Sequence, residues 1–154
     1  MASGLPDYFR GVDVAYQNLS EMITRPKYGG ALMESGSETL VPDGWATLDL
    51  IIGKGMLYGA TIWLDHTSSQ ANSYLDVLLD GTSLNNISFL RLNDYGIAKP
   101  RSSIITINKY DPVDHIYSVG LSYGLTFESY LMLIYYEEHN TNPTVHYRLV
   151  YALI

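Results

Sequence analysis

The chain contains no cysteine among its 154 residues, which excludes disulfide bonds, thiolate metal sites and a cysteine nucleophile. Basic residues are scarce too: 9 Lys and Arg stand against 16 Asp and Glu, for a net charge of −7. Sequence-independent binding to nucleic acid, like docking on an anionic membrane, needs clustered Lys and Arg. We therefore expect neither a nucleic-acid partner nor a membrane partner.

Long hydrophobic runs are also missing. The longest, Tyr130–Tyr136 and Leu149–Ile154, are far shorter than the roughly 20 residues that cross a bilayer as a helix. The first residues include Asp7 and Arg10, where a secretory signal peptide would have an unbroken apolar stretch. These features predict a soluble protein that is made without an export signal.

Charge of either sign is low, whereas tyrosine is abundant. Charged residues make up 16% of the chain, against roughly 25% in typical soluble domains. Apolar residues make up 47%, and there are 14 Tyr but only 3 Phe and 2 Trp. Such a composition predicts a folded chain rather than a disordered one. It favours a structural or binding role over catalysis.

The first thirty residues differ from the rest of the chain. Before Pro26, the side chains of Ala15, Leu19, Met22 and Ile23 fall on one face of a helix. A helix outside a β domain has little core of its own to join. We predict that residues 1–30 form a helical or extended arm that packs on a neighbouring subunit through Leu19, Met22 and Ile23. The alternative is a short helix that packs on its own domain.

From residue 31 onward the pattern has the period of two that is typical of β-strands. Turn residues separate the apolar runs, and Asp80-Gly81 is a strong hairpin signal. Short strands at such spacing predict an all-β chain, an antiparallel β-sandwich of jelly-roll type over residues 31–154. The nine predicted strands are Glu38–Val41, Trp45–Ile52, Met56–Asp65, Ser73–Asp80, Leu84–Leu92, Ser103–Lys109, His115–Leu121, Tyr130–Glu137 and Thr144–Leu153.

The same period assigns side chains to faces. Leu48 shares a face with Leu50, and Tyr58 shares a face with Ile62, whereas Asp76 faces outward.

Two of the strands are apolar on both faces, the one from Tyr130 to Glu137 and the last one. A strand without a polar face must be covered by other parts of the protein, or by a partner, on each of its two faces. The N-terminal helix or a long loop could provide the second cover, but tyrosine is enriched at subunit interfaces, which favours a contact between subunits. The predicted interface residues in these strands are Tyr130, Met132, Ile134, Tyr136, Tyr147 and Tyr151.

The sequence contains no recognisable metal-binding, catalytic or nucleotide-binding motif. The four histidines show no H-x-H or H-x-x-x-H spacing, so no metal site is predicted. No serine lies in a G-x-S-x-G context, and the glycines from Gly53 to Gly59 precede a strand rather than a helix. We expect no enzyme activity and no cofactor. A triad assembled across loops would leave no such signature, so a small hydrolase is the weakest alternative.

Exposed aromatic residues indicate a different function. Tryptophans with Asn neighbours form sugar-binding platforms in many β-sandwiches. Trp45, Trp63, Asn85 and Asn86 are the residues that would form such a site here, although nothing in the sequence places them together. The alternative is a purely structural role, in which each tryptophan covers a sheet edge or fills a contact between subunits.

Two segments carry a resemblance to a known class of proteins. Gly53–Asp65 has a glycine turn that leads into a strand, and Tyr74–Thr82 has a strand that ends at Asp-Gly. Together they resemble modules of tailed-bacteriophage virion structural proteins, namely capsid decoration, head-fibre and tail accessory proteins. These are typically β-sandwiches, are frequently trimeric and often have an N-terminal arm.

The resemblance implies a virion structural protein, most simply a homotrimeric capsid decoration or accessory protein. Its partners would be copies of itself and a capsid or other virion protein, to which the arm anchors it. It would be made in the host cytoplasm and lie on the outer surface of the particle. The alternative function is a carbohydrate-binding module that reads the receptor at the tip of a fibre or tail protein.

Overall fold

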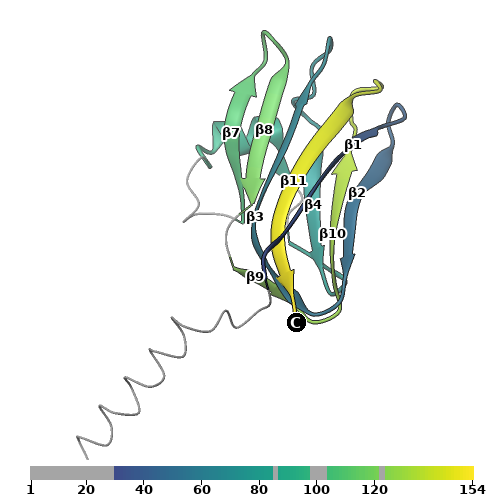
Figure 1. The fold of residues 1–154 in the computed structure, drawn as a ribbon. Coiled ribbons are helices and arrows are strands. Elements are labelled where there is room, and N and C mark those ends of the chain that lie inside the picture. Colours follow the sequence, from purple (N-terminus) through teal and green to yellow (C-terminus); the bar gives the residue numbers. More distant parts are fainter. Residues whose placement is uncertain (1–29, 85–86, 98–103, 122–123) are drawn as a thin grey trace, which may run out of the picture.

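The computed structural model describes residues 30–84, 87–97, 104–121 and 124–154, and Figure 1 shows the arrangement of the elements. The predicted arm, with Leu19, Met22 and Ile23, lies outside the described residues. The same holds for Asn85 and Asn86.

The strands form two antiparallel sheets that lie face to face (Figure 1). Sheet A has the order β1 (Leu32–Thr39), β11 (Thr144–Leu153), β3 (Gly55–Asp65), β8 (Ile116–Leu121) and β7 (Ile105–Asp111), with β9 (Leu125–Phe127) paired to β3. Sheet B has the order β2 (Trp45–Ile52), β10 (Tyr130–Tyr136), β4 (Tyr74–Leu79) and β5 (Thr82–Ser83), with β6 (Ile87–Ser88) paired to β4. The predictions of an all-β chain and of antiparallel pairing are confirmed.

The turn between β4 and β5 follows the Asp-Gly signal. Asp80 and Gly81 both have positive φ, 51° and 85°, as a type I′ hairpin turn requires. The Asp80 carboxylate accepts hydrogen bonds from the backbone N–H groups of Glu128, Ser129 and Tyr130, at 2.9, 2.7 and 3.0 Å. These hydrogen bonds hold the pKa of Asp80 below its usual range. The turn therefore also fixes the start of β10.

The segment predicted as a strand from Leu84 to Leu92 is mostly something else. Only β6 is extended, and the helix α2 (Phe89–Asp94) follows it. Ser88 is its N-cap, and the hydroxyl accepts a hydrogen bond from the Arg91 N–H. Phe89 and Leu92, three residues apart, are both buried on the inner side of the helix. A short apolar run fits a strand or a helix, and here the serine cap decides for the helix.

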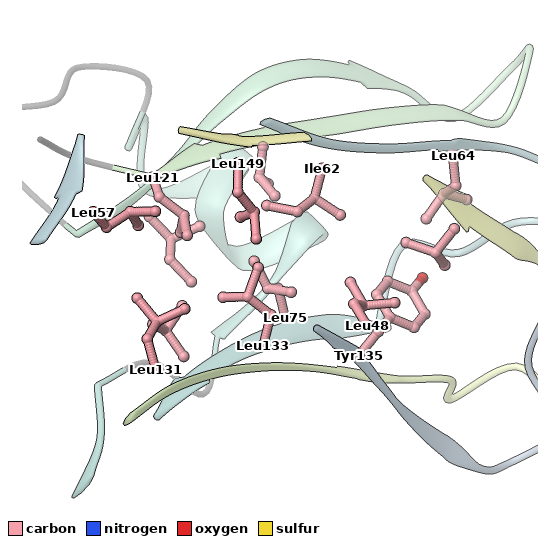
Figure 2. Packing of buried hydrophobic residues seen from close by; sticks show 14 of the residues in the cluster. Leu48, Leu57, Ile62, Leu64, Leu75, Leu121, Leu131, Leu133, Tyr135 and Leu149 are labelled. Carbon is pink, nitrogen blue, oxygen red and sulfur yellow. The ribbon is translucent and has the colours of Figure 1, made fainter. Parts of the chain in front are cut away.

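The core lies between the sheets. In Figure 2, Ile62 and Leu149 of sheet A face Leu75 and Leu133 of sheet B. Tyrosine takes part: Tyr117 and Tyr135 are among the largest fully buried side chains. The tyrosine content is therefore divided between the core and the surface.

Two bulges change the faces that a strict period of two assigns. In the β2–β10 ladder, Leu48 is the extra residue, and alternation restarts beyond it. Leu48 and Ile51 are buried, whereas Leu50 is 46% exposed and Ile52 is 72% exposed. The prediction that Leu48 and Leu50 share a face is therefore wrong.

The second bulge lies in β3, where Tyr58 is the extra residue in the ladder with β11. Leu57 is fully buried with Ile62, and Tyr58 lines a hollow on the opposite face. The prediction that Tyr58 and Ile62 share a face is wrong for the same reason.

Asp76 faces away from the core, as the alternation of its strand predicts, yet it is not open to solvent. It pairs with Ile134 on that side of sheet B and is buried. The Ser83 hydroxyl donates to its two carboxylate oxygens, at 2.7 and 2.9 Å, which explains how a carboxylate is accommodated there.

Candidate functional site

The face of sheet B that points away from the core is covered by large apolar side chains. Register places them in rows across the strands. Met132 of β10 lies between Leu50 of β2 and Leu78 of β4. In the next row but one, Tyr136 lies between Trp45 and Tyr74, and its ring stacks on that of Tyr74 at 4.7 Å. We name this surface the apolar face; its residues are Trp45, Leu50, Ile52, Tyr74, Leu78, Tyr130, Met132, Ile134 and Tyr136.

The apolar face is exposed at its margin and packed at its centre. Trp45 is 63% exposed, whereas Ile134 in the middle of β10 is only 6% exposed. The acidic residue in these rows, Asp76, is buried and bound by Ser83. The surface can therefore contact another protein by shape and desolvation, with its one carboxylate already hydrogen-bonded within the domain.

Of the predicted interface residues, four come together on this face: Tyr130, Met132, Ile134 and Tyr136. The other two described ones do not join them. Tyr147 and Tyr151 point to the inner side of β11, where Tyr151 belongs to the core cluster and Tyr147 packs against it.

Sequence reasoning missed Trp45, Leu50 and Ile52 as members of the apolar face. The signal that finds them is the cross-strand register with β10, because these three residues pair with Tyr136, Met132 and Tyr130.

An acidic cluster lies at the edge where β1 and β2 approach each other. The Tyr151 hydroxyl donates to Glu34 Oε2 at 3.1 Å. Asp49 Oδ2 is buried, and no hydrogen-bond partner for it is found among the described residues. Burial, and next the charge of Glu34, raise the pKa of Asp49. Burial likewise raises the pKa of Tyr147, with a contribution from Asp49.

The outer face of sheet A has a different composition. Thr61 of β3 lies between Arg148 of β11 and Gly120 of β8. One row along, Trp63 pairs with His146, and their rings stack at 5.6 Å between centroids. Small and polar residues dominate here, in contrast to the apolar face.

A hollow of about 470 Å³ lies in this face. Side chains of four strands surround it. We name it the sheet A hollow; its lining residues are Tyr58, Gly59, Ala60, Thr61, Thr106, Asn108, Gly120, Leu121, Arg148 and Val150. The volume lies within the range of ligand sites in proteins.

The two tryptophans predicted to bind sugar are not brought together. Trp45 lies in β2 of sheet B and Trp63 in β3 of sheet A, and each points away from the core on its own sheet. A single site cannot hold both tryptophans.

Polar residues gather in the loops at one end of the two sheets, where Glu137 is buried. Its Oε1 accepts hydrogen bonds from the Thr141 hydroxyl and the His139 N–H, both at 2.8 Å. Its Oε2 accepts one from the Asp43 N–H at 2.7 Å. Burial by itself raises the pKa of Glu137, but these hydrogen bonds outweigh burial and hold it below its usual value. Glu137 thus ties the β1–β2 loop to the β10–β11 loop.

A serine and a histidine lie in the same network, and their bonding is structural. The buried Ser73 hydroxyl donates to Gln70 Oε1 at 2.9 Å and accepts from the Glu138 N–H. His139 Nε2 accepts from the Asn72 N–H at 2.9 Å. Ser73 therefore directs its proton to an amide oxygen and not to the imidazole.

Two kinds of feature are absent from the described part of the chain. In it, no three side chains of the metal-ligating types gather closely enough to hold an ion. Likewise, no helix within these residues has the length and apolarity that a membrane crossing requires.

Comparison with known proteins gives structural neighbours alone. No protein-family model matches the chain, and no curated protein matches its sequence. A chain of the capsid asymmetric unit of cyanophage Pam1 is similar at a TM-score of 0.46 and 13% identity, over 84% of this chain and 89% of that one. A serine protease of Aeromonas sobria is similar at a TM-score of 0.37 and 10% identity, over 88% of this chain and 29% of the protease. The same protease in complex with a chaperone gives 0.36 and 11%, again over 88% and 29%. Similarities of this size assign no function.

Proposed function

We propose that the chain is a virion structural protein, an oligomeric capsid decoration or accessory protein whose subunits meet through the apolar face. The single observation that carries the proposal is this face: exposed Trp45, Leu50 and Ile52 flank a packed row from β10 and β4. Covering exposed apolar area of this kind with a second apolar surface removes it from water and so lowers the free energy of the assembly.

The proposal names a second copy of the chain as the occupant. The acidic residue of these rows is buried and hydrogen-bonded to Ser83, so the exposed part of the face is apolar rather than charged. A second copy of the same surface would match it in chemistry. Aromatic residues and methionine are also enriched at interface cores. A homotrimer is the proposed stoichiometry.

The strand order supports a jelly roll as the finer description of the fold. The first strand pairs with the last, and the second pairs with the last but one. The two sheets then read β1-β11-β3-β8 and β2-β10-β4-β5, with β7 at the edge of sheet A. Double-sheet jelly rolls occur in viral capsid domains, which agrees with the proposed role.

The finer parts of the proposal follow from it. Residues 1–30 would anchor the subunit to a capsid or other virion protein. The subunit would lie on the outer surface of the particle. The net charge of −7 favours a position away from the genome. The chain would be made in the host cytoplasm, and it would act by binding rather than by catalysis.

Two measurements test the proposal. Light scattering of the full chain at micromolar concentration is expected to give a multiple of the 17.2 kDa subunit mass. Mass spectrometry of purified particles of the encoding virus is expected to find the chain at a copy number comparable to that of the capsid subunits. A stable monomer would remove the self-association, and a chain absent from the particles would remove the virion role.

A further inference from the structure

The sheet A hollow is formed by specific features of the strands around it. Tyr58 and Asn108 are each the extra residue of a bulge, in β3 and β7, and both line the hollow. Bulges re-aim side chains and are frequent next to binding sites. Between them, Gly59 and Gly120 contribute no side chain, so the floor stays open. A Cβ at Gly120 would lie 3.0 Å from the Asn108 amide nitrogen, which shows how closely that amide overhangs the floor.

Arg148 provides a charge at the rim that is not neutralised. Its Nε and Nη2 atoms point to the sulfur of Met33, at 3.2 and 2.9 Å. A thioether is only a weak acceptor. None of the lining residues of the hollow is acidic, and no carboxylate among the described residues pairs with Arg148. The net charge of −7 opposes an anionic ligand at long range, so the attraction comes from contact: an exposed guanidinium without a carboxylate partner among the described residues can pair with a carboxylate of the ligand.

Trp63 adds a flat apolar surface beside this charge. Trp63 is 39% exposed, and its ring stacks on that of His146. Because Arg148 pairs with Thr61, Trp63 and Arg148 are diagonal neighbours, about 7–8 Å apart between their strand positions.

From this arrangement we propose that the sheet A hollow binds a saccharide that carries carboxylates, such as a polymer of uronic acids. One sugar ring stacks on Trp63, and its carboxylate receives two hydrogen bonds from Arg148. Hydroxyl groups of the sugar pair with Thr61, Asn108 and the Tyr58 hydroxyl around the hollow. The shape is open, so it suits a stretch of polymer better than an enclosed small molecule.

The saccharide is favoured over an acidic peptide by the partners around the charge. A side-chain carboxylate of a peptide would use Arg148 alone, whereas a sugar also uses the aromatic ring and the hydroxyl and amide groups. The proposal is independent of the self-association described above. The hollow lies on sheet A and the apolar face on sheet B, so either can fail without the other.

The test uses the full chain with Trp45→Phe, which leaves Trp63 as the one tryptophan of the protein. Oligogalacturonate and a neutral glucose oligomer of equal length are titrated while Trp63 fluorescence and the heat of binding are recorded. Binding of the oligogalacturonate with a shift in the fluorescence is expected. Arg148→Gln is expected to weaken this binding by at least about tenfold, because a charge-assisted pair of hydrogen bonds is lost.

Lys109→Gln is the matched control. Lys109 lies on the same face but is already paired with Asp111 at 3.0 Å, so its removal is expected to change affinity less than about twofold. Four results would overturn the proposal: no binding of the acidic oligomer, equal binding of the neutral oligomer, equally tight binding of a poly-glutamate peptide, or an equal loss with Lys109→Gln.

Discussion

The outer faces of the two sheets follow the same alternating pattern and yet have opposite character. On sheet B, the outward positions hold large apolar side chains, such as Trp45, Met132 and Tyr136. On sheet A, the corresponding positions hold Thr61, Gly120 and other small or polar residues, with a hollow between them. Few charges lie on either. Covering the apolar face of sheet B removes apolar area from water and is stabilising. The outer face of sheet A can remain in water and hold a ligand.

The largest expected effect distinguishes the two sides of β10. Leu133→Ala removes a fully buried side chain between the sheets and is expected to cost about 2–5 kcal/mol of stability. Met132→Ala, one residue away on the apolar face, is expected to cost less than about 1 kcal/mol in the monomer. Urea unfolding at a concentration where the chain is monomeric measures both. An equal loss of unfolding free energy in the two variants would mean that the apolar face is as buried as the core. The two sides of β10 would then not differ.

A second prediction concerns the loops that hold the two sheets together at one end. Glu137→Gln keeps the size of the side chain but removes the charge that four hydrogen bonds stabilise, and is expected to cost about 1–3 kcal/mol. The pKa of Glu137 is lowered in the folded chain, so its contribution is present above the ordinary carboxyl pKa and is lost as pH falls through the folded value.

The control for this prediction is the pH series itself. Wild type and Glu137→Gln should converge in unfolding free energy at acid pH. A constant difference from neutral to acid pH would show that the loss comes from packing and not from the carboxylate.

A smaller effect of opposite sign is expected at the edge between β1 and β2. The pKa of Asp49 is raised in the folded chain, so the stability that its proton provides is full below the ordinary value of 3.8 and is lost as pH rises through the folded value. Asp49→Asn is therefore expected to stabilise the protein at neutral pH, by about 0.5–1 kcal/mol once solvent screening of this half-buried group is allowed for. Thermal unfolding at neutral and acid pH checks it; a destabilised variant at neutral pH would show that the carboxylate is needed there.

Much of the fold could be predicted from the pattern of residues. Strands such as β4, β8 and β11 follow from alternation and turn residues, and the hairpin at Asp80-Gly81 follows from its demand for positive φ. The strand predicted from Leu84 to Leu92 failed because a short apolar run also fits a helix, and the wrong assignments of faces came where one extra residue shifts the period. The extra residues Leu48 and Tyr58 leave no mark in the sequence, because a bulge is fixed by the partner strand.

The candidate surfaces could be predicted only in part. The double-sided apolar pattern of Tyr130–Tyr136 marks one strand of the apolar face. Its neighbours follow from register, which joins residues about 90 positions apart, such as Trp45 and Tyr136. The sheet A hollow depends on two bulges and two glycines in different strands, and no local motif encodes such an arrangement.

The most direct test of the central claim is the mass of two matched variants in solution. Met132→Lys places a charge at the centre of the apolar face, and Thr61→Lys places the same charge on the outer face of sheet A. Sedimentation of the full chain at micromolar concentration is expected to show multimers for wild type and Thr61→Lys, and a folded 17.2 kDa monomer for Met132→Lys. A wild-type monomer, or a Met132→Lys variant that assembles as wild type does, would contradict the account.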